Sequence, residues 1–417
     1  MKPKSLIVYP SAIIVFLAGL FFANAAAAAT VVEVPAKDLP ALVGQPVAAI
    51  RLYASPDGGA AKPIPFQIDE RDAKGQWLMD SSVNAAATFD PQDVLLFHLD
   101  DAGAALQGTP LPAARARMEI AAAGKFVYAA AEENPGPRST KSYVSYRAGQ
   151  DRVSTAFYDI GFSTRQALVQ DVLILRNGKA QTDVLDRFKV RFNLAIKNFF
   201  DFKIEEGDVD ARVAGTRVGS IRVIRRVVAT KKLGPINVIP KSVTDFLFYP
   251  NWVEVPTRIQ NPIDGPKFLE DKTRGLSGYD FTSAIYGSVV YASQGGTAAL
   301  NGVPEAAEQG LGQGAATWWS LTGPAGSLVV GIQNDGKLEQ LGIRPTLRVI
   351  DDANNGAPPE GESGQSLVGF DLPYHKIPKG SFLIQVRQVF PWRFEHGRET
   401  AYLEEAKSVS AESVRAL

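Results

Sequence analysis

Two short segments of this 417-residue sequence combine aromatic rings with other polar or aromatic side chains. His396 lies in the segment 392–398, which begins with Trp392 and also holds glutamate and arginine, while Trp318 and Trp319 are adjacent. Aromatic faces stack on sugar rings, and charged groups hydrogen-bond sugar hydroxyls. We predict all four as ligand-binding residues, although in a strand one of the two adjacent tryptophans must face the core. The alternative for the adjacent tryptophans is that both pack in the core. The alternative for the segment 392–398 is a strand end that carries surface charges.

A second candidate is a change of charge along the chain. Carboxylates gathered in residues 201–210 are followed by arginines and lysines in residues 212–232. If these segments pair as strands, cross-strand ion pairs explain the pattern. The alternative is a basic face for an acidic ligand such as a uronate polymer, because arginine binds carboxylates bidentately. On that interpretation Arg222 and Arg226 are ligand-binding residues.

No motif for a nucleophile, a metal or a cofactor accompanies these residues. Gly-x-Ser-x-Gly and Walker A motifs are absent, and no two of the histidines form a His-x-x-x-His pair. We therefore predict no cofactor and no metal, and we assign no catalytic residue. A lyase or hydrolase would need a base beside a charge-neutralising arginine. The base would come from Tyr374, His375 or His396, and the arginine from Arg393 or Arg398.

The N-terminus has the order of a secretory signal peptide. Lys2 and Lys4 precede an apolar run over residues 6–22, and small residues follow up to Ala29. The run is short for a membrane span, which needs about 20 residues. We expect cleavage, with an uncleaved anchor as the alternative, and a periplasmic or extracellular protein with no membrane contact after cleavage.

Composition narrows the class of protein. Because 44 basic residues balance 44 acidic ones, no global field attracts nucleic acid. The absence of cysteine excludes disulfides, iron–sulfur clusters and covalent c-type haem. Frequent turns, with 37 glycines and 27 prolines, favour an all-β chain.

Hydrophobic patterns predict where strands lie. Short apolar runs bounded by turns predict strands at 50–53, 63–69, 94–99, 126–131, 172–175 and 328–332. Two prolines make the second of these an edge strand. Alternation over residues 188–196 predicts a strand with its phenylalanines buried and with Lys189 and Arg191 in water. Asn177-Gly178 and Asp335-Gly336 are typical of hairpin turns. His98 is expected to face a polar partner from its strand.

A resemblance adds to these patterns. Residues 63–70 contain Pro-x-Pro-x-Gln-x-Asp, an acidic strand follows at 89–97, and Asp-Asp-Ala-Gly stands at 100–103. This order resembles a group of exported bacterial proteins, some associated with polysaccharide breakdown. Residues 219–226 resemble a strand of the galactose-mutarotase-like supersandwich, a large antiparallel β fold of sugar epimerases and polysaccharide lyases. The histidine and glutamate pattern of the mutarotases is not found, so the resemblance implies a fold and assigns no functional residue.

We predict an all-β protein in which an antiparallel, supersandwich-like β-sandwich follows a smaller N-terminal β unit. The segments are a signal peptide (1–29), the N-terminal unit (30–135), the large sandwich (136–400) and a polar, frayed tail (401–417). Residues 293–316 and 351–366 are expected to be loops, the first with a short helix around residues 304–309 as an alternative. The predicted function is that of an exported carbohydrate-associated binding protein of the cell envelope, with a polysaccharide or oligosaccharide ligand. The alternatives are a polysaccharide lyase or glycoside hydrolase, and a structural or assembly partner of an envelope protein.

Overall fold

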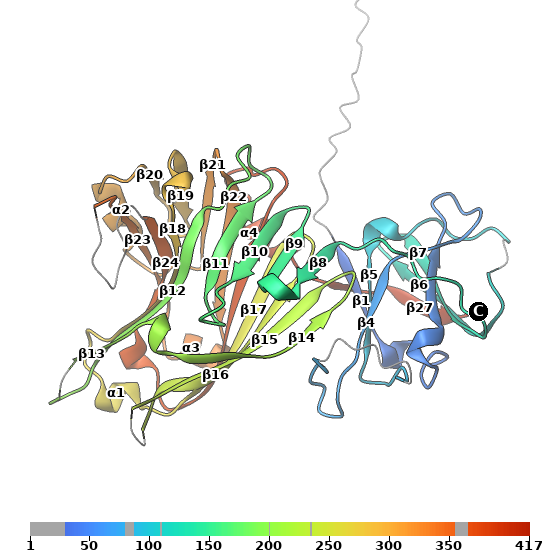
Figure 1. Cartoon of the computed structure of the whole chain (residues 1–417), viewed down its shortest axis with the longest axis horizontal. Coiled ribbons are helices and arrows are strands. Elements are labelled where there is room, and N and C mark those ends of the chain that lie inside the picture. Colours follow the sequence, from blue (N-terminus) through green and yellow to red (C-terminus); the bar gives the residue numbers. More distant parts are fainter. Residues whose placement is uncertain (1–29, 80–86, 109–110, 200, 234–235, 355–365) are drawn as a thin grey trace, which may run out of the picture.

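The computed structural model describes residues 30–79, 87–108, 111–199, 201–233, 236–354 and 366–417, and it confirms an all-β architecture of antiparallel sheets (Figure 1). A smaller unit holds strands from both ends of the described chain, and a larger sandwich holds the middle. The predicted signal peptide lies outside the described residues.

The smaller unit consists of two sheets. The first has the order β26 (Val409–Ser410), β1 (Val31–Pro35), β5 (Val94–His98) and β4 (Phe66–Asp69). The second has the order β27 (Ser413–Ala416), β6 (Ala114–Ala122), β7 (Lys125–Glu132), β2 (Ile50–Ala54) and β3 (Lys62–Pro63). Three 3₁₀ turns connect them: η1 (Ala36–Asp38), η2 (Val47–Ala49) and η3 (Leu99–Asp101).

Prolines shape the edges of this unit as the sequence predicts. The single strand expected over 63–69 is split, so that β3 ends at Pro63 on the edge of one sheet and β4 is the edge strand of the other. Pro65 between them removes a backbone donor, which a central strand would need. His98 meets its expected polar partner, because its Nδ1 accepts a hydrogen bond from the Asp100 backbone at 3.2 Å.

The larger unit is built on a nine-stranded sheet. Its order is β14 (Asp210–Val218), β15 (Val223–Leu233), β16 (Ile236–Phe248), β17 (Trp252–Asn261), β25 (Gly380–Val389), β22 (Gly326–Asn334), β21 (Trp318–Gly323), β19 (Ser288–Ala292) and β20 (Thr297–Leu300). A five-stranded sheet has the order β13 (Asp201–Ile204), β12 (Leu185–Ala195), β18 (Arg274–Phe281), β24 (Ser366–Leu372) and β23 (Thr346–Asp351). A four-stranded sheet has the order β11 (Gln170–Leu175), β10 (Tyr158–Phe162), β9 (Arg152–Thr155) and β8 (Val144–Arg147).

Short helices connect these strands. They are α1 (Gly265–Phe268), α2 (Ala306–Leu311), α3 (Gly336–Gln340) and α4 (Glu399–Glu405), with 3₁₀ turns η4 (Ala148–Gln150), η5 (Glu206–Asp208), η6 (Ser283–Ile285) and η7 (Tyr374–Lys376). The segment 293–316 contains α2 close to the short helix expected there, and it also contains the strand β20, which was not expected. Most of the other expected loop, residues 355–365, lies outside the described residues.

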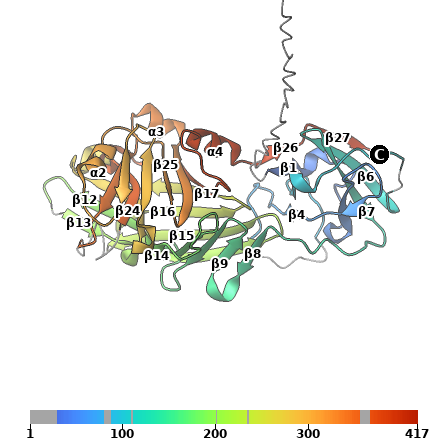
Figure 2. The same ribbon diagram turned by 90° about the horizontal axis from the view of Figure 1, so that it is seen from above.

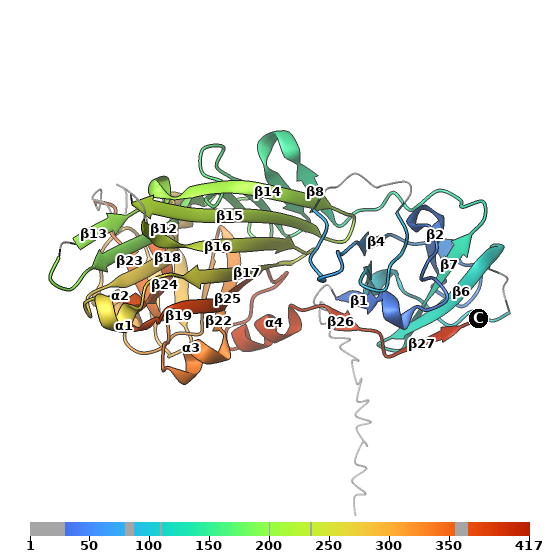
Figure 3. The ribbon, with the colours of Figure 1, turned by 90° about the horizontal axis from the view of Figure 1, so that it is seen from below.

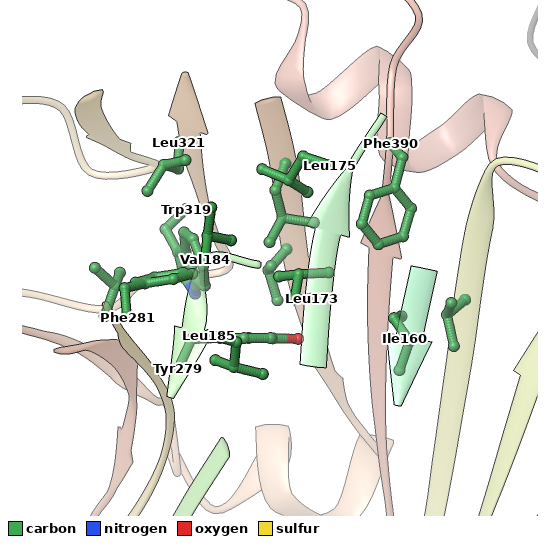
Figure 4. Packing of buried hydrophobic residues seen from close by; sticks show 14 of the residues in the cluster. Ile160, Leu173, Leu175, Val184, Leu185, Tyr279, Phe281, Trp319, Leu321 and Phe390 are labelled. Carbon is green, nitrogen blue, oxygen red and sulfur yellow. The ribbon is translucent and has the colours of Figure 1, made fainter. Parts of the chain in front are cut away.

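The main hydrophobic core lies between the sheets of the sandwich (Figure 4). Trp319 packs edge-to-face against Tyr279 and Phe281, with ring centroids 5.5 and 6.4 Å apart. Ile160 and Leu173 reach the same core from β10 and β11. All three sheets of the larger unit thus bury their inner faces together.

The C-terminal tail joins the two units and is not frayed. From α4, which packs against the sandwich, the chain crosses to the smaller unit (Figures 2 and 3). There β26 pairs in parallel with β1, and β27 pairs antiparallel with β6. Backbone pairing with two separate sheets holds a segment whose composition alone predicts disorder.

Neither segment forms the predicted two-residue hairpin turn, although a single antiparallel bridge between Ile174 and Asp183 spans the Asn177 turn. The Asn177 side chain bonds the backbone of Ser327 and Pro391, and β11 pairs with β10 instead of forming a ladder with the next strand. Asp335 is the N-cap of α3, because its carboxylate accepts from the backbone of Lys337 and Leu338 at 3.1 Å. Asn and Asp side chains serve caps and loop contacts as readily as two-residue turns.

Candidate functional site

A buried ion network joins the two units, with Arg222 at its centre. The guanidinium contacts the Asp69 carboxylate at 2.6 Å and Glu33 at 2.7 Å, both from the smaller unit. Tyr249 accepts from Arg222 and donates to Glu33. The Arg222 side chain is 1 % exposed, so this predicted ligand-binding residue is a structural link that no ligand at the surface can reach.

The Pro-x-Pro-x-Gln-x-Asp segment supplies the other half of the network. Gln67 accepts hydrogen bonds from the Ile221 and Arg222 backbone at 3.1 and 2.9 Å, and its amide donates to Asp69 at 2.7 Å. Asp69 also pairs with Arg217 at 3.0 Å. The polar positions of this motif therefore attach the smaller unit to the end of β14 and to the connection that leads into β15.

The environment keeps Arg222 charged and Tyr249 neutral. Burial alone would lower the pKa of Arg222, but the oxygens of Tyr249, Asp69 and Glu33 raise it above its ordinary value. Burial raises the pKa of Tyr249 far above that of a free tyrosine, although Arg222 opposes the shift. A cation and a neutral hydroxyl satisfy the two carboxylates.

A cleft of about 230 Å³ opens beside this network, between the two units. Its walls include parts of η2 and β4 of the smaller unit, residues 138–139 of the connection, and residues 217–220, which comprise the end of β14 and the turn after it. Part of the basic stretch 212–232 thus lines a groove. Arg217 has its donors occupied there by Asp69, Glu70 and the carbonyls of Ile68 and Leu78.

Arg138 differs from Arg217 in the same cleft. Its Nη2 donates to the Val47 carbonyl at 2.7 Å, and its guanidinium lies over the Phe66 ring at 4.7 Å from the centroid. Burial, followed by repulsion from Arg51, lowers the pKa of Arg138. Arg51 bonds the carbonyls of Ala48, Ile50 and Gly136. Within the described ranges neither arginine has a carboxylate partner, so Arg138, which lines the cleft, contributes local positive charge there.

The predicted tryptophans do not form one site. Trp319 is completely buried in the core, while Trp318 is partly exposed, as expected for adjacent strand residues. Trp392 is 64 % exposed and contacts Phe157 edge-to-face at 6.0 Å. Arg226 is also occupied, because it forms a cross-strand pair at 2.6 Å with Asp245 of β16, a carboxylate outside the 201–210 segment.

His396 belongs to an aromatic group on the sandwich surface. Its ring stacks on Tyr291 at 4.0 Å, and its Nδ1 lies 2.8 Å from the buried Glu399 carboxylate. Ser320 bonds the same carboxylate oxygen at 3.3 Å. A serine nucleophile must instead bond the histidine, so these three residues are not a Ser-His-acid triad. They form a histidine–glutamate pair beside an aromatic ring.

The other proposed bases lie elsewhere. Tyr374 and His375 are in η7, which contacts α1 and β18, while His396 precedes α4, which contacts β21, β22 and β25. Tyr374 donates to Asn261 at 2.9 Å, and burial raises its pKa above that of a free tyrosine. The structure therefore does not assemble Tyr374, His375 and His396 into one constellation.

Sequence reasoning missed Arg51 and Arg138. Each is a single arginine in an unremarkable segment, and its lack of a carboxylate partner is visible only in three dimensions. Among the described residues no group of three or more His, Cys, Asp or Glu side chains could hold a metal ion. No helix in the described ranges is long and apolar enough to cross a membrane.

No protein-family model and no curated protein sequence matches this chain. Similar solved structures include an alpha-mannosidase from Enterococcus faecalis, with 12 % identity and a TM-score of 0.47 over 93 % of this chain and 44 % of that one. This chain therefore spans less than half the length of that enzyme. A galactose mutarotase related enzyme from Lactobacillus acidophilus has 8 % identity and a TM-score of 0.33, over 58 % of this chain and 96 % of that one. A putative aldose 1-epimerase from Escherichia coli has 9 % identity and a TM-score of 0.34, over 61 % of this chain and 99 % of that one. Mutarotase-like proteins are thus among the similar structures, as the resemblance predicts, and a likeness of this size assigns no activity.

Proposed function

We propose that this protein is an exported carbohydrate-associated binding protein of the cell envelope, and that the cleft between its two units holds the carboxylate of an acidic sugar. The observation that carries the proposal is the Arg138 guanidinium, which lies in that cleft beside Arg51 without a carboxylate partner in the described chain. Ligand sites commonly lie where two domains meet.

The chemistry of the cleft fits a uronate better than a neutral sugar. An arginine guanidinium bonds a carboxylate through two parallel N–H donors, and such charged bonds are stronger than neutral ones. Ser139 and Ser220 line the same cleft and are suited to sugar hydroxyls. The signal-like order of residues 1–29 supports export to the compartment where such polymers occur.

The test compares a uronate oligosaccharide with its carboxyl-reduced neutral counterpart by titration calorimetry. We expect the uronate to bind and added salt to weaken it, because charge drives the contact. Losing a hydrogen bond to a charged group costs about 1.5–3 kcal/mol, so Arg138→Gln should weaken uronate binding about tenfold or more. Arg344→Gln, an equal change of charge at an exposed arginine away from the cleft, is the matched control. Equal binding of both sugars, or an unaffected Arg138→Gln variant, would reject the proposal.

Export has its own measurement. Expression of the full chain with N-terminal sequencing of the product should give a mature protein that starts near residue 30. A product that keeps residues 1–29 would favour the uncleaved anchor.

A polysaccharide lyase or glycoside hydrolase is the second candidate, and one observation favours it. Glu399 orients the His396 ring through Nδ1, while the exposed imidazole keeps its other nitrogen available to act as a base. If this pair is catalytic, His396→Ala should abolish turnover of a substrate that the wild-type protein cleaves, whereas His98→Asn should not. Intact turnover in His396→Ala would exclude the pair. The assembly-partner alternative stays a prediction.

A further inference from the structure

A second hollow lies inside the large sandwich, separate from the cleft between the units. Its volume is about 200 Å³, and it lies between the inner faces of the nine-stranded and five-stranded sheets. An engineered apolar cavity of about 150 Å³ is already large enough to bind benzene. The intersheet cavity is therefore large enough for a small organic molecule.

The walls of the intersheet cavity are mostly apolar and carry no charged side chain among the described residues. Phe188, Val190 and Phe192 of β12 face Val255 and Ile259 of β17 across it. No Asp, Glu, Lys, Arg or His is among the described residues that line it. Phe188, Val190 and Phe192 keep partial exposure. Apolar side chains in a hollow that solvent can reach are typical of a site for an apolar ligand.

The charged side chains of β12 lie on the face opposite the cavity. Lys189 pairs with Asp280 at 2.6 Å, with both side chains 0 % exposed, and Arg191 pairs with Glu206 at 2.6 Å. This reverses the prediction that the phenylalanine face is buried and the lysine and arginine face is wet. Because burying ions is costly, the arrangement is hard to explain by stability alone. It does leave the cavity wall free of charge.

Three of the residues that line the cavity each have a buried polar atom with no hydrogen-bond partner among the described residues. These atoms are the Tyr279 hydroxyl on β18, Gln170 Oε1 on β11 and Gln388 Oε1 on β25. Each side chain belongs to a residue at most 3 % exposed. Buried polar atoms are nearly always hydrogen-bonded, so atoms of this kind point to a partner that the protein itself does not supply.

We propose that the intersheet cavity binds a neutral amphipathic molecule, an apolar chain that ends in a hydroxyl group. The chain packs against the β12 and β17 walls, and the hydroxyl bonds Tyr279, Gln170 or Gln388. A carboxylate or phosphate is disfavoured, because no cation lines the cavity to pair with it and a lone buried charge is costly. This inference is independent of the proposed uronate site.

The test titrates the protein at pH 8 with 1-octanol and, separately, with octanoate, which has the same chain length and a charged end. We expect 1-octanol to bind and octanoate to bind at least about tenfold more weakly. Tyr279→Phe should weaken 1-octanol by about two- to tenfold, the effect of one neutral hydrogen bond. Tyr291→Phe, on the sandwich surface, is the matched control and should change nothing.

Two variants that fill the cavity complete the design. Val190→Trp on the five-stranded sheet and Ser242→Phe on the nine-stranded sheet should each abolish binding of 1-octanol, with circular dichroism and thermal unfolding verifying the fold. Arg138→Gln should leave 1-octanol binding unchanged, which separates this site from the uronate cleft. Absent 1-octanol binding, equal binding of octanoate, or binding retained in a folded cavity-filling variant would overturn the proposal.

Discussion

The cleft between the units and the cavity inside the sandwich have similar volumes, about 230 and 200 Å³, and opposite chemistry. The cleft contains two arginines and lies beside a buried ion network, whereas the cavity has no charged lining residue in the described chain. The difference follows from the structural elements that form the cleft and the cavity. Connections and strand ends meet at the cleft, whereas the inner faces of two sheets meet at the cavity.

The comparison teaches that buried ion pairs lie beside the cleft, where separate units must be aligned, whereas those of β12 lie on the strand face opposite the cavity. Arg222 and Asp69 come from different units, and their bonds require one orientation. At the cavity the two sheets meet instead through many apolar side chains, whose contact is non-directional. A polar ligand is therefore expected at the first place and an apolar one at the second.

The largest effect is expected from breaking the ion network. Asp69→Ala leaves the buried Arg222 and the neighbouring Arg217 without their shared carboxylate, which should cost about 3–5 kcal/mol of unfolding free energy. Glu133→Ala, which breaks the exposed pair with Arg115, should cost less than about 1 kcal/mol. Denaturant unfolding measures both variants. Equal losses would show that the network does not hold the units together.

A smaller effect on the free energy of unfolding is expected from pH, through His98 in β5 of the smaller unit. Burial lowers the pKa of His98 below its ordinary value, although Asp100 and Asp101 oppose the shift and Lys141 adds to it. As pH falls through about 6.5, the unfolded chain takes up the proton first, so the free energy of unfolding falls. Between pH 8 and pH 5 the His98→Asn variant should lose less stability than the wild type. An identical loss in both proteins would show that His98 does not contribute to the pH dependence of stability.

A pair of tyrosines sharpens the contrast inside the sandwich. Tyr158 donates to the Tyr249 carbonyl at 2.6 Å, so Tyr158→Phe should cost about 1 kcal/mol of unfolding free energy. Tyr279 has no partner in the described ranges, so Tyr279→Phe should be neutral or slightly stabilising. Urea unfolding compares the two directly. A comparable loss in both would mean that the Tyr279 hydroxyl is already satisfied.

The smallest effect on stability is expected at the surface. Trp392→Ala removes an indole that is 64 % exposed, so the unfolding free energy should change by less than about 0.5 kcal/mol. Titration of the same variant with oligosaccharides tests function, because it measures sugar affinity. If the variant loses oligosaccharide affinity while Arg138→Gln keeps it, the carbohydrate site is the aromatic surface and not the cleft.

Local patterns in the sequence predicted much of the strand content. The runs at 50–53, 94–99 and 126–131 are β2, β5 and β7 within one or two residues, and prolines predicted the edge strands. Local turn signals were less reliable than strand patterns. The Asn177 side chain bonds the Pro391 backbone, and Asp335 caps α3, so neither forms a two-residue hairpin turn. A short polar side chain has several favourable partners, and the surrounding fold selects among them.

The candidate sites were less predictable than the strands. Alternation correctly predicted β12, but period two says only that its two faces differ. Which face lines a cavity depends on the sheet packed against it, and here the ion pairs of Lys189 and Arg191 are buried on the other side. Arg222 and Arg226 were selected as ligand residues from a basic stretch, whereas their carboxylate partners Asp69 and Asp245 occupy them.

The sequence by itself determined that the chain is all-β, cysteine-free and held by burial, because composition and strand periodicity are local properties that each segment carries with it. It also placed Gln67 and Asp69 in a distinctive motif. Only the tertiary structure decided what that motif does, which arginine remains without a carboxylate, and where the tail goes. These outcomes depend on pairing between residues as far apart as Val32 and Val409, and such pairing is a property of the assembled sheets and not of any one segment.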